Sequence, residues 1–276
     1  MVKRSLPYQN KEGESILDKG IIDIELWRFI AAYVFVLLLL FIVKWRGISR
    51  EKQIILASFR MTIQLIMAGY ILTYIFDHPS PWLTIGIIVI MEAFAVRNIF
   101  KQVKYEMDKK LKGIAALSLL IGTLISLFYF NMVVIHFSPW YEPRYFIPIA
   151  GMIVGNSMTG ITLGINTLLG GLKDQREKVE GALMLGATPK AASKKYVDNA
   201  FDAAILPTLN NMLGMGIIFL PGMMTGQILS GISPLVAIEY QIAILLGIVG
   251  SVALTVISFI LMGYKQLFTR DAQLNV

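Results

Sequence analysis

Long apolar segments separated by short polar loops dominate the chain from residue 24 onward. A helix needs about 20 mostly apolar residues to cross the hydrocarbon core of a bilayer. Seven segments approach or exceed that length, so the pattern predicts an all-α, polytopic membrane protein with about seven transmembrane helices. The predicted spans are residues 24–43, 54–76, 82–99, 114–137, 146–169, 200–220 and 235–262.

The composition supports lipid as part of the solvent. Hydrophobic residues make up 56% of the 276 residues, and the mean hydropathy is +0.66, whereas soluble domains are about 45–50% apolar. A net charge of +7 can indicate a nucleic-acid partner. Here the basic residues gather in short loops between apolar segments, so membrane topology explains them and no nucleic-acid partner is expected. The absence of cysteine excludes disulfides, zinc–thiolate sites and iron–sulfur ligation by this chain.

The distribution of Lys and Arg predicts the orientation. Eighteen of these residues lie in one set of loops and the C-terminal tail, and five lie in the opposite set. The side richer in positive charge is cytoplasmic. We therefore expect an extracytoplasmic segment at 1–23, a permease domain at 24–265 and a cytoplasmic tail at 266–276, in a cell (plasma or inner) membrane.

The longest soluble stretch between spans is a predicted cytoplasmic loop, residues 173–199. Local propensity predicts two helices in it, residues 174–185 and 190–196. Gly186 is placed to end the first helix as its C′ residue, because glycine adopts the left-handed conformation found there. Thr188 offers an N-cap hydroxyl to the second helix, and Pro189 fits its first turn.

The first of these helices has an apolar side that needs a cover. Val179, Ala182, Leu183 and Leu185 form this side. Periodicity alone favours an amphipathic helix resting in the lipid headgroups. The spacing of Glu180 and Gly186 instead favours a docking surface for another protein.

That spacing resembles the permeases of the ABC superfamily, whose cytoplasmic loop carries Glu-Ala-Ala-x-x-x-Gly followed by Ile-x-Leu-Pro. Glu180, Ala182 and Gly186 match, Gly181 replaces the first alanine, and Ile-Leu-Pro occurs at residues 205–207. The resemblance implies a loop on which a cytoplasmic ATPase docks. The coupling residues expected on it are Glu180, Ala182, Leu183, Gly186, Thr188 and Pro189.

A closer likeness extends over residues 59–264. The segments that carry it are Arg60 with Gln64-Leu65, Gly-Asn-Ser-Met-Thr-Gly at 155–160, Leu-Pro-Thr-Leu-Asn at 206–210, and Leu-Pro-Gly-Met-Met-Thr-Gly-Gln-Ile-Leu-Ser-Gly at 220–231 followed by Ser-Pro-Leu at 233–235. These segments resemble the FetB-like iron-export permeases and their plant aluminium-tolerance relatives. The resemblance implies a homodimer driven by two copies of a separate ATPase, which would bind ATP and Mg, and a metal ion as cargo.

Motifs for chemistry on this chain itself are missing. No Gly-x-x-x-x-Gly-Lys-Ser/Thr phosphate-binding loop occurs, so ATP hydrolysis is expected on a partner and no cofactor on this chain. No nucleophile–base arrangement is evident, so an enzyme is not expected. Two other functions stay open: a secondary carrier driven by an ion gradient, and a membrane scaffold that transports nothing.

Two charged residues lie inside predicted spans, Arg60 in the second and Glu92 in the third. A lone charge at the bilayer centre costs about 2.5–3.5 kcal/mol on insertion scales, so such charges usually find partners. We predict that Arg60 and Glu92 approach each other. The alternative is that Arg60 extends to the cytoplasmic headgroups.

The fifth and sixth predicted spans contain an unusual number of polar residues and helix breakers. Pro207 predicts a kink or break, and polar side chains beside a broken helix commonly line a transport pathway. The predicted pathway residues are Asn156, Ser157, Thr159, Asn166, Asn210, Asn211, Met223, Met224, Thr225 and Gln227. The alternative for each is interhelical hydrogen bonding, and for a glycine stripe at 151, 155, 160 and 164 it is close helix packing.

The segment 221–234 is too broken for a span and too apolar for a solvated loop, so it predicts a re-entrant segment or a short outer helix. Five methionines lie in this segment or in the two predicted spans before it: Met158, Met212, Met215, Met223 and Met224. Thioethers suit Cu(I) better than iron, but methionine more often fills space in a core, and packing is the favoured role. The residues alone therefore do not identify iron as the cargo.

Overall fold

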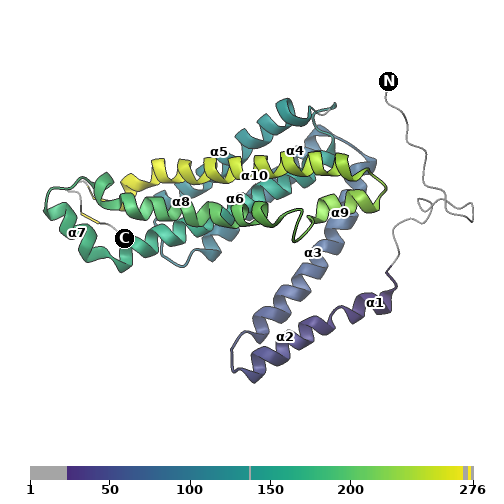
Figure 1. Cartoon of the computed structure of the whole chain (residues 1–276), viewed down its shortest axis with the longest axis horizontal. Helices are drawn as coiled ribbons and strands as arrows, with labels where there is room; N and C mark the ends of the chain where they lie inside the picture. The colour runs from purple at the N-terminus through teal and green to yellow at the C-terminus, as the bar shows by residue number, and fades with distance from the viewer. Residues whose placement is uncertain (1–23, 137, 270–272, 275–276) are drawn as a thin grey trace, which may run out of the picture. The chain divides into compact units, whose positions relative to one another are not determined.

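The computed structural model describes residues 24–136, 138–269 and 273–274 (Figure 1). In these residues the regular secondary structure is helical. The helices are α1 (Leu26–Ala31), α2 (Val34–Trp45), α3 (Glu51–Asp77), α4 (Pro81–Gln102), α5 (Lys109–Tyr129), the π-helix η2 (Phe130–Ile135), α6 (Pro143–Asp174), α7 (Arg176–Met184), α8 (Pro189–Gly214), α9 (Gly222–Leu229), α10 (Pro234–Gly263) and the 3₁₀-helix η3 (Tyr264–Leu267). The predicted extracytoplasmic segment 1–23 and part of the predicted tail lie outside the described residues.

The chain divides into two compact units. The first comprises Met1–Asp77 and Thr225–Ala237. In it α2 packs against α3, and the Tyr33 and Thr62 hydroxyls form a hydrogen bond between α1–α2 and α3. The side chains of α3 are mostly exposed, including large apolar ones such as Phe59 and Leu65, as expected of a helix that faces lipid.

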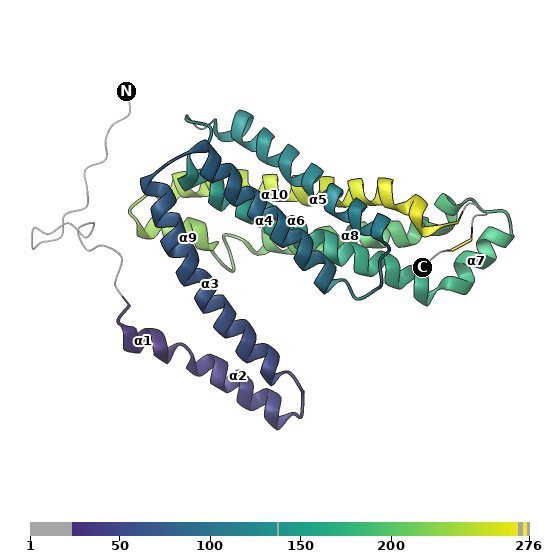
Figure 2. The same cartoon turned by 180° about the vertical axis from the view of Figure 1, so that it is seen from behind.

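The second unit comprises His78–Met224 and Ile238–Val276, and α6 is its central helix. The 32 residues of α6 pack against α4, α5 and α8, and these helices run side by side with α10 in both views (Figures 1 and 2). Apolar residues on several faces of α6 are buried because it has neighbours on several sides. They include Ile149, Ile153, Ile161, Ile165, Leu168, Leu169 and Leu172.

Small residues bring the helices of this unit together. A Cβ atom added at Gly160 would lie 2.6 Å from Val252 Cγ1 and 3.2 Å from the Ala204 carbonyl oxygen. The glycine stripe of α6 therefore makes the expected close packing at Gly160, and also at Gly164. It does not do so at Gly155, where no atom lies within 4 Å of an added Cβ.

In the described residues, six helical segments are long and apolar enough to cross a bilayer. The predicted span 200–220 is not among them, because it forms part of α8, whose first half is charged and which ends at Gly214. The helix predicted separately at 190–196 is the start of the same α8. Of the predicted kink or break at Pro207, the break is wrong, because α8 continues through this residue.

Candidate functional site

The predicted coupling loop folds as α7, a tight turn and the start of α8. Gly186 has φ +90°, the left-handed conformation that favours glycine. The amide of Gly186 donates to the Leu183 carbonyl, and the amide of Ala187 donates to the Ala182 carbonyl, both at 3.0 Å. These are the two hydrogen bonds of a Schellman motif, so the predicted C′ role of Gly186 is confirmed.

The start of α8 is also as predicted. The Thr188 hydroxyl accepts a hydrogen bond from the Ala191 amide at 3.2 Å, and Pro189 occupies the first helical turn. An N-cap of this kind satisfies a backbone donor that the helix itself cannot pair. The direction in which the chain leaves α7 is therefore set by Gly186 and Thr188 together.

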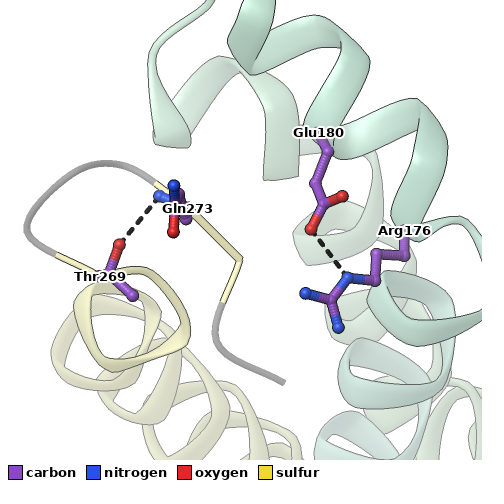
Figure 3. A network of polar contacts seen from close by, with 4 residues as sticks. All are labelled: Arg176, Glu180, Thr269 and Gln273. Atoms are coloured by element: carbon purple, nitrogen blue, oxygen red, sulfur yellow. Dashed lines mark hydrogen bonds and ion pairs between the residues drawn. The ribbon is translucent and has the colours of Figure 1, made fainter.

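Glu180 is paired within its own helix. Its Oε1 lies 2.8 Å from Arg176 Nε, an ion pair between neighbours one turn apart (Figure 3). An exposed pair with this spacing contributes only about 0.3–0.5 kcal/mol. Glu180 can therefore exchange this partner for another cation at low cost.

The apolar side of α7 divides into a buried base and an exposed tip. Val179 is 1% exposed, and Leu183 packs against the same core. By contrast, Met184 is 86% exposed and Leu185 is 91% exposed, directly before the turn. Two large apolar side chains at the tip of a hairpin are the kind of surface that either lipid or a protein partner covers.

The C-terminal segment joins the same hydrophobic core as the base of α7. Leu267, Phe268 and Leu274 are buried in the same core as Val179 and Leu172. Thr269 and Gln273 are joined by two hydrogen bonds, and Figure 3 shows this pair close to the ion pair of α7. Both whole-chain views place the last described part of the chain beside α7. Sequence reasoning treated residues 266–276 only as a tail, although Leu267, Phe268 and Leu274 are apolar.

Several predicted pathway residues take part in helix contacts. The Ser157 hydroxyl forms a 2.8 Å hydrogen bond with Ser251 of α10, and Ser251 donates to the Gly122 carbonyl of α5 at 3.3 Å. Asn166 accepts from the Lys104 amide at 2.8 Å, and its Nδ2 lies 3.5 Å from the Gln102 carbonyl, so it caps the C-terminal end of α4. For Ser157 and Asn166, interhelical bonding describes the observed contacts.

The other predicted pathway residues are dispersed. Asn156 and Thr159 bond to carbonyls one turn earlier in α6, while Asn210 and Asn211 are exposed on α8. Of the residues on α9, Met223 and Met224 belong to the second unit, and Thr225 and Gln227 belong to the first. α9 itself is the short helix predicted within 221–234. A single pathway through all ten residues stays a prediction.

Glu92 is 4% exposed on α4. Its Oε1 accepts a 2.5 Å hydrogen bond from the Thr123 hydroxyl of α5, and its Oε2 has no hydrogen-bond partner. Thr123 was not predicted as a partner of Glu92, although a hydroxyl residue inside an apolar span is a recognisable candidate for such a role. Arg60 lies in the other unit, so its pairing with Glu92 stays a prediction.

Carboxylates and imidazoles do not assemble into a metal site in the described part of the chain. There, no group of three or more His, Asp or Glu side chains could hold an ion. Glu142 at the start of α6 and Glu239 in α10 belong to no such group. Any metal bound by these residues would need other ligands.

Six helices able to cross a bilayer, packed in part around α6, define a multi-pass α-helical membrane protein. Residues 26–268 match the model of the uncharacterised protein family UPF0014, and the chain belongs to this family. No solved structure matches it.

Three relatives illustrate the range of the family. The chain is 35% identical over 246 residues to the UPF0014 membrane protein YjkA of Bacillus subtilis, with 88% of this chain and 95% of the relative covered. It is 35% identical over 245 residues to the protein ALUMINUM SENSITIVE 3 of Arabidopsis thaliana, covering 89% and 88%. It is 32% identical over 229 residues to the probable iron export permease protein FetB of Escherichia coli, covering 83% and 86%. The family expected from the sequence is thus confirmed.

Proposed function

We propose that this chain is the membrane permease subunit of an ABC transporter that exports a metal ion. A separate cytoplasmic ATPase, with ATP and Mg bound on it, would drive transport, and the permease would act as a homodimer. Iron is the proposed cargo because the Escherichia coli relative is named a probable iron export permease.

The α7–α8 turn is the observation that carries the proposal. Its apolar tip, Met184 and Leu185, is more than four-fifths exposed, while Val179 anchors the base of the same helix in the core. A rigid helix with an exposed apolar tip fits an acceptor groove on a protein partner. A helix lying in the headgroups would instead place the apolar residues of its whole length toward lipid.

Motion of a docked ATPase would reach the membrane helices through continuous backbone. α8 runs without interruption from Pro189 in the coupling loop to Gly214, and it packs along α6. A tilt imposed at the turn would therefore move α8 against α6 as a lever. Alternating exposure of a pathway requires such a two-state element.

Affinity purification of the tagged chain in mild detergent, followed by mass spectrometry, tests the proposal. A soluble ABC ATPase recovered in near-equal amount is the expected result, together with ATP-dependent metal transport in vesicles containing both chains. A chain that purifies alone and still transports in vesicles without ATP would favour the gradient-driven carrier. A chain that purifies alone and transports nothing would favour the scaffold.

A pair of glycine variants tests the docking site. Gly186→Val should abolish recovery of the ATPase and uncouple transport, because a β-branched residue is strained at φ +90°. Gly181→Ala is the matched control, since an added Cβ at Gly181 meets no atom within 4 Å. It should leave docking intact and stabilise α7 by about 0.5–1 kcal/mol. Normal ATPase recovery by the Gly186→Val variant would contradict the role of the turn.

A further inference from the structure

A cavity of about 400 Å³ lies at the C-terminal end of α8, within the second unit. Three methionines from three consecutive segments line it: Met212 of α8, Met215 of the following turn, and Met224 of α9. Met224 is 7% exposed, so it faces the protein interior. The sequence places these residues up to 12 positions apart, and the fold brings them to one cavity.

The rest of the lining contains one buried polar side chain, Gln241 of α10. It is 7% exposed, and its Oε1 forms no hydrogen bond in the described structure. A buried carbonyl oxygen without a partner is unfavourable, because no hydrogen bond compensates for its loss of contact with water. Such an atom beside a cavity is accounted for when a ligand or ion completes its contacts.

The chemistry of these donors selects the ligand. Thioether sulfurs are soft and uncharged, and they favour Cu(I) over Fe(II) or Mg²⁺, which prefer harder donors. The described lining contains no carboxylate or imidazole that would suit a hard divalent ion. Methionine side chains are also flexible enough to converge on an ion from separate segments.

We infer that this cavity is a binding site for a soft monovalent metal ion of the Cu(I) class, with the sulfurs of Met212, Met215 and Met224 as ligands. Gln241 supplies a further oxygen donor at the edge of the site. The inferred ligand is distinct from the proposed iron cargo, and the inference depends on the proposed function only for its consequence in transport.

Cu(I) binding to the purified full-length chain in detergent tests the site, with bicinchoninate as the competing chelator. The wild-type chain should bind one Cu(I), and X-ray absorption should report a first shell dominated by sulfur. The triple variant Met212→Leu, Met215→Leu and Met224→Leu removes the ligands while conserving side-chain volume. It should weaken Cu(I) binding by at least about tenfold, since thioether is the donor that selects Cu(I).

The matched control changes three exposed methionines outside the cavity, Met61, Met67 and Met132, to leucine. This variant should bind Cu(I) as the wild type does. Three results would overturn the inference: no Cu(I) binding by the wild type, equal loss in the two triple variants, or a first shell of nitrogen and oxygen. Loss of the ATPase partner alone would refute the proposed function and leave Cu(I) binding unchanged.

Discussion

Of the glycines in the described chain, Gly122 of α5 leaves the least room for a side chain, because Thr255 of α10 lies against it. A Cβ atom added there would lie 2.7 Å from the Thr255 backbone nitrogen and 2.8 Å from its Cα. Backbone atoms of a packed helix cannot move aside cheaply. The Gly122 carbonyl also accepts from Ser251, which in turn bonds Ser157. The small size of Gly122 thus allows hydrogen bonds to join α5, α10 and α6.

Gly122→Ala should therefore destabilise the protein by about 1–3 kcal/mol, the usual cost of overpacking a core. The thermal unfolding midpoint of the detergent-purified chain measures the effect. Gly113→Ala is the control in the same helix, because no atom lies within 4 Å of a Cβ added there. A midpoint for Gly122→Ala at or above that of Gly113→Ala would contradict the close approach.

The residues that sequence reasoning assigned correctly are those governed by local rules. Gly186 and Thr188 took their predicted capping roles because a helix end depends on only a few neighbouring residues. The partners of Ser157 and Asn166 lie at least 60 positions away in the chain. The sequence pattern of one span does not reveal such distant partners. The polar residues could therefore be predicted, but not which of them line a pathway and which bond to another helix.

At the scale of helices, apolar length predicted most spans but misjudged α8. The charged start of this helix predicts a separate surface element, and Pro207 predicts a kink or break. A proline removes one backbone hydrogen bond, yet neighbouring helices can support the chain on either side. Ala200 and Ala204 of the continuous helix lie against Gly160 and Gly164 of α6, and Thr208 is buried. Tertiary packing therefore overrode the local signal.

The C-terminal segment beyond α10 is expected to hold α7 in place. Leu267 is 2% exposed in the core that contains Val179, whereas Leu261, on the same helical continuation, is 66% exposed. Leu267→Ala should remove about 2–5 kcal/mol of packing and loosen α7. Faster hydrogen exchange over residues 174–188 is the expected result.

Leu261→Ala makes the same chemical change on an exposed position and should leave that exchange unchanged. If the proposed function holds, transport by the Leu267→Ala variant should fall relative to ATP hydrolysis by the proposed ATPase, because a loosened α7 transmits less motion. Unchanged exchange over α7 in Leu267→Ala would show that the C-terminal contact does not support this helix.

At the scale of the whole molecule, the charge distribution predicts which loops face the cytoplasm, and α8 determines how many times the chain crosses. If α8 is a span, its two ends lie on opposite sides of the membrane. If only the six more apolar segments cross, the ends of α8 lie on the same side. Length and composition do not separate these cases, because the apolar part of α8 is shorter than about 20 residues.

The absence of cysteine allows a direct test by single-cysteine labelling. Ser49, Pro79, Ala191 and Ser230 are exposed positions in four different connections or helix ends. In intact cells, an impermeant maleimide should label Pro79→Cys and Ser230→Cys, and should label Ser49→Cys and Ala191→Cys only after the membrane is opened. The excess of Lys and Arg beside the latter two positions is the physical reason. Labelling of Ala191→Cys and Ser230→Cys from the same side would show that α8 does not cross the membrane. It would also contradict the proposed role of α8 as a lever from the predicted coupling loop into the bilayer.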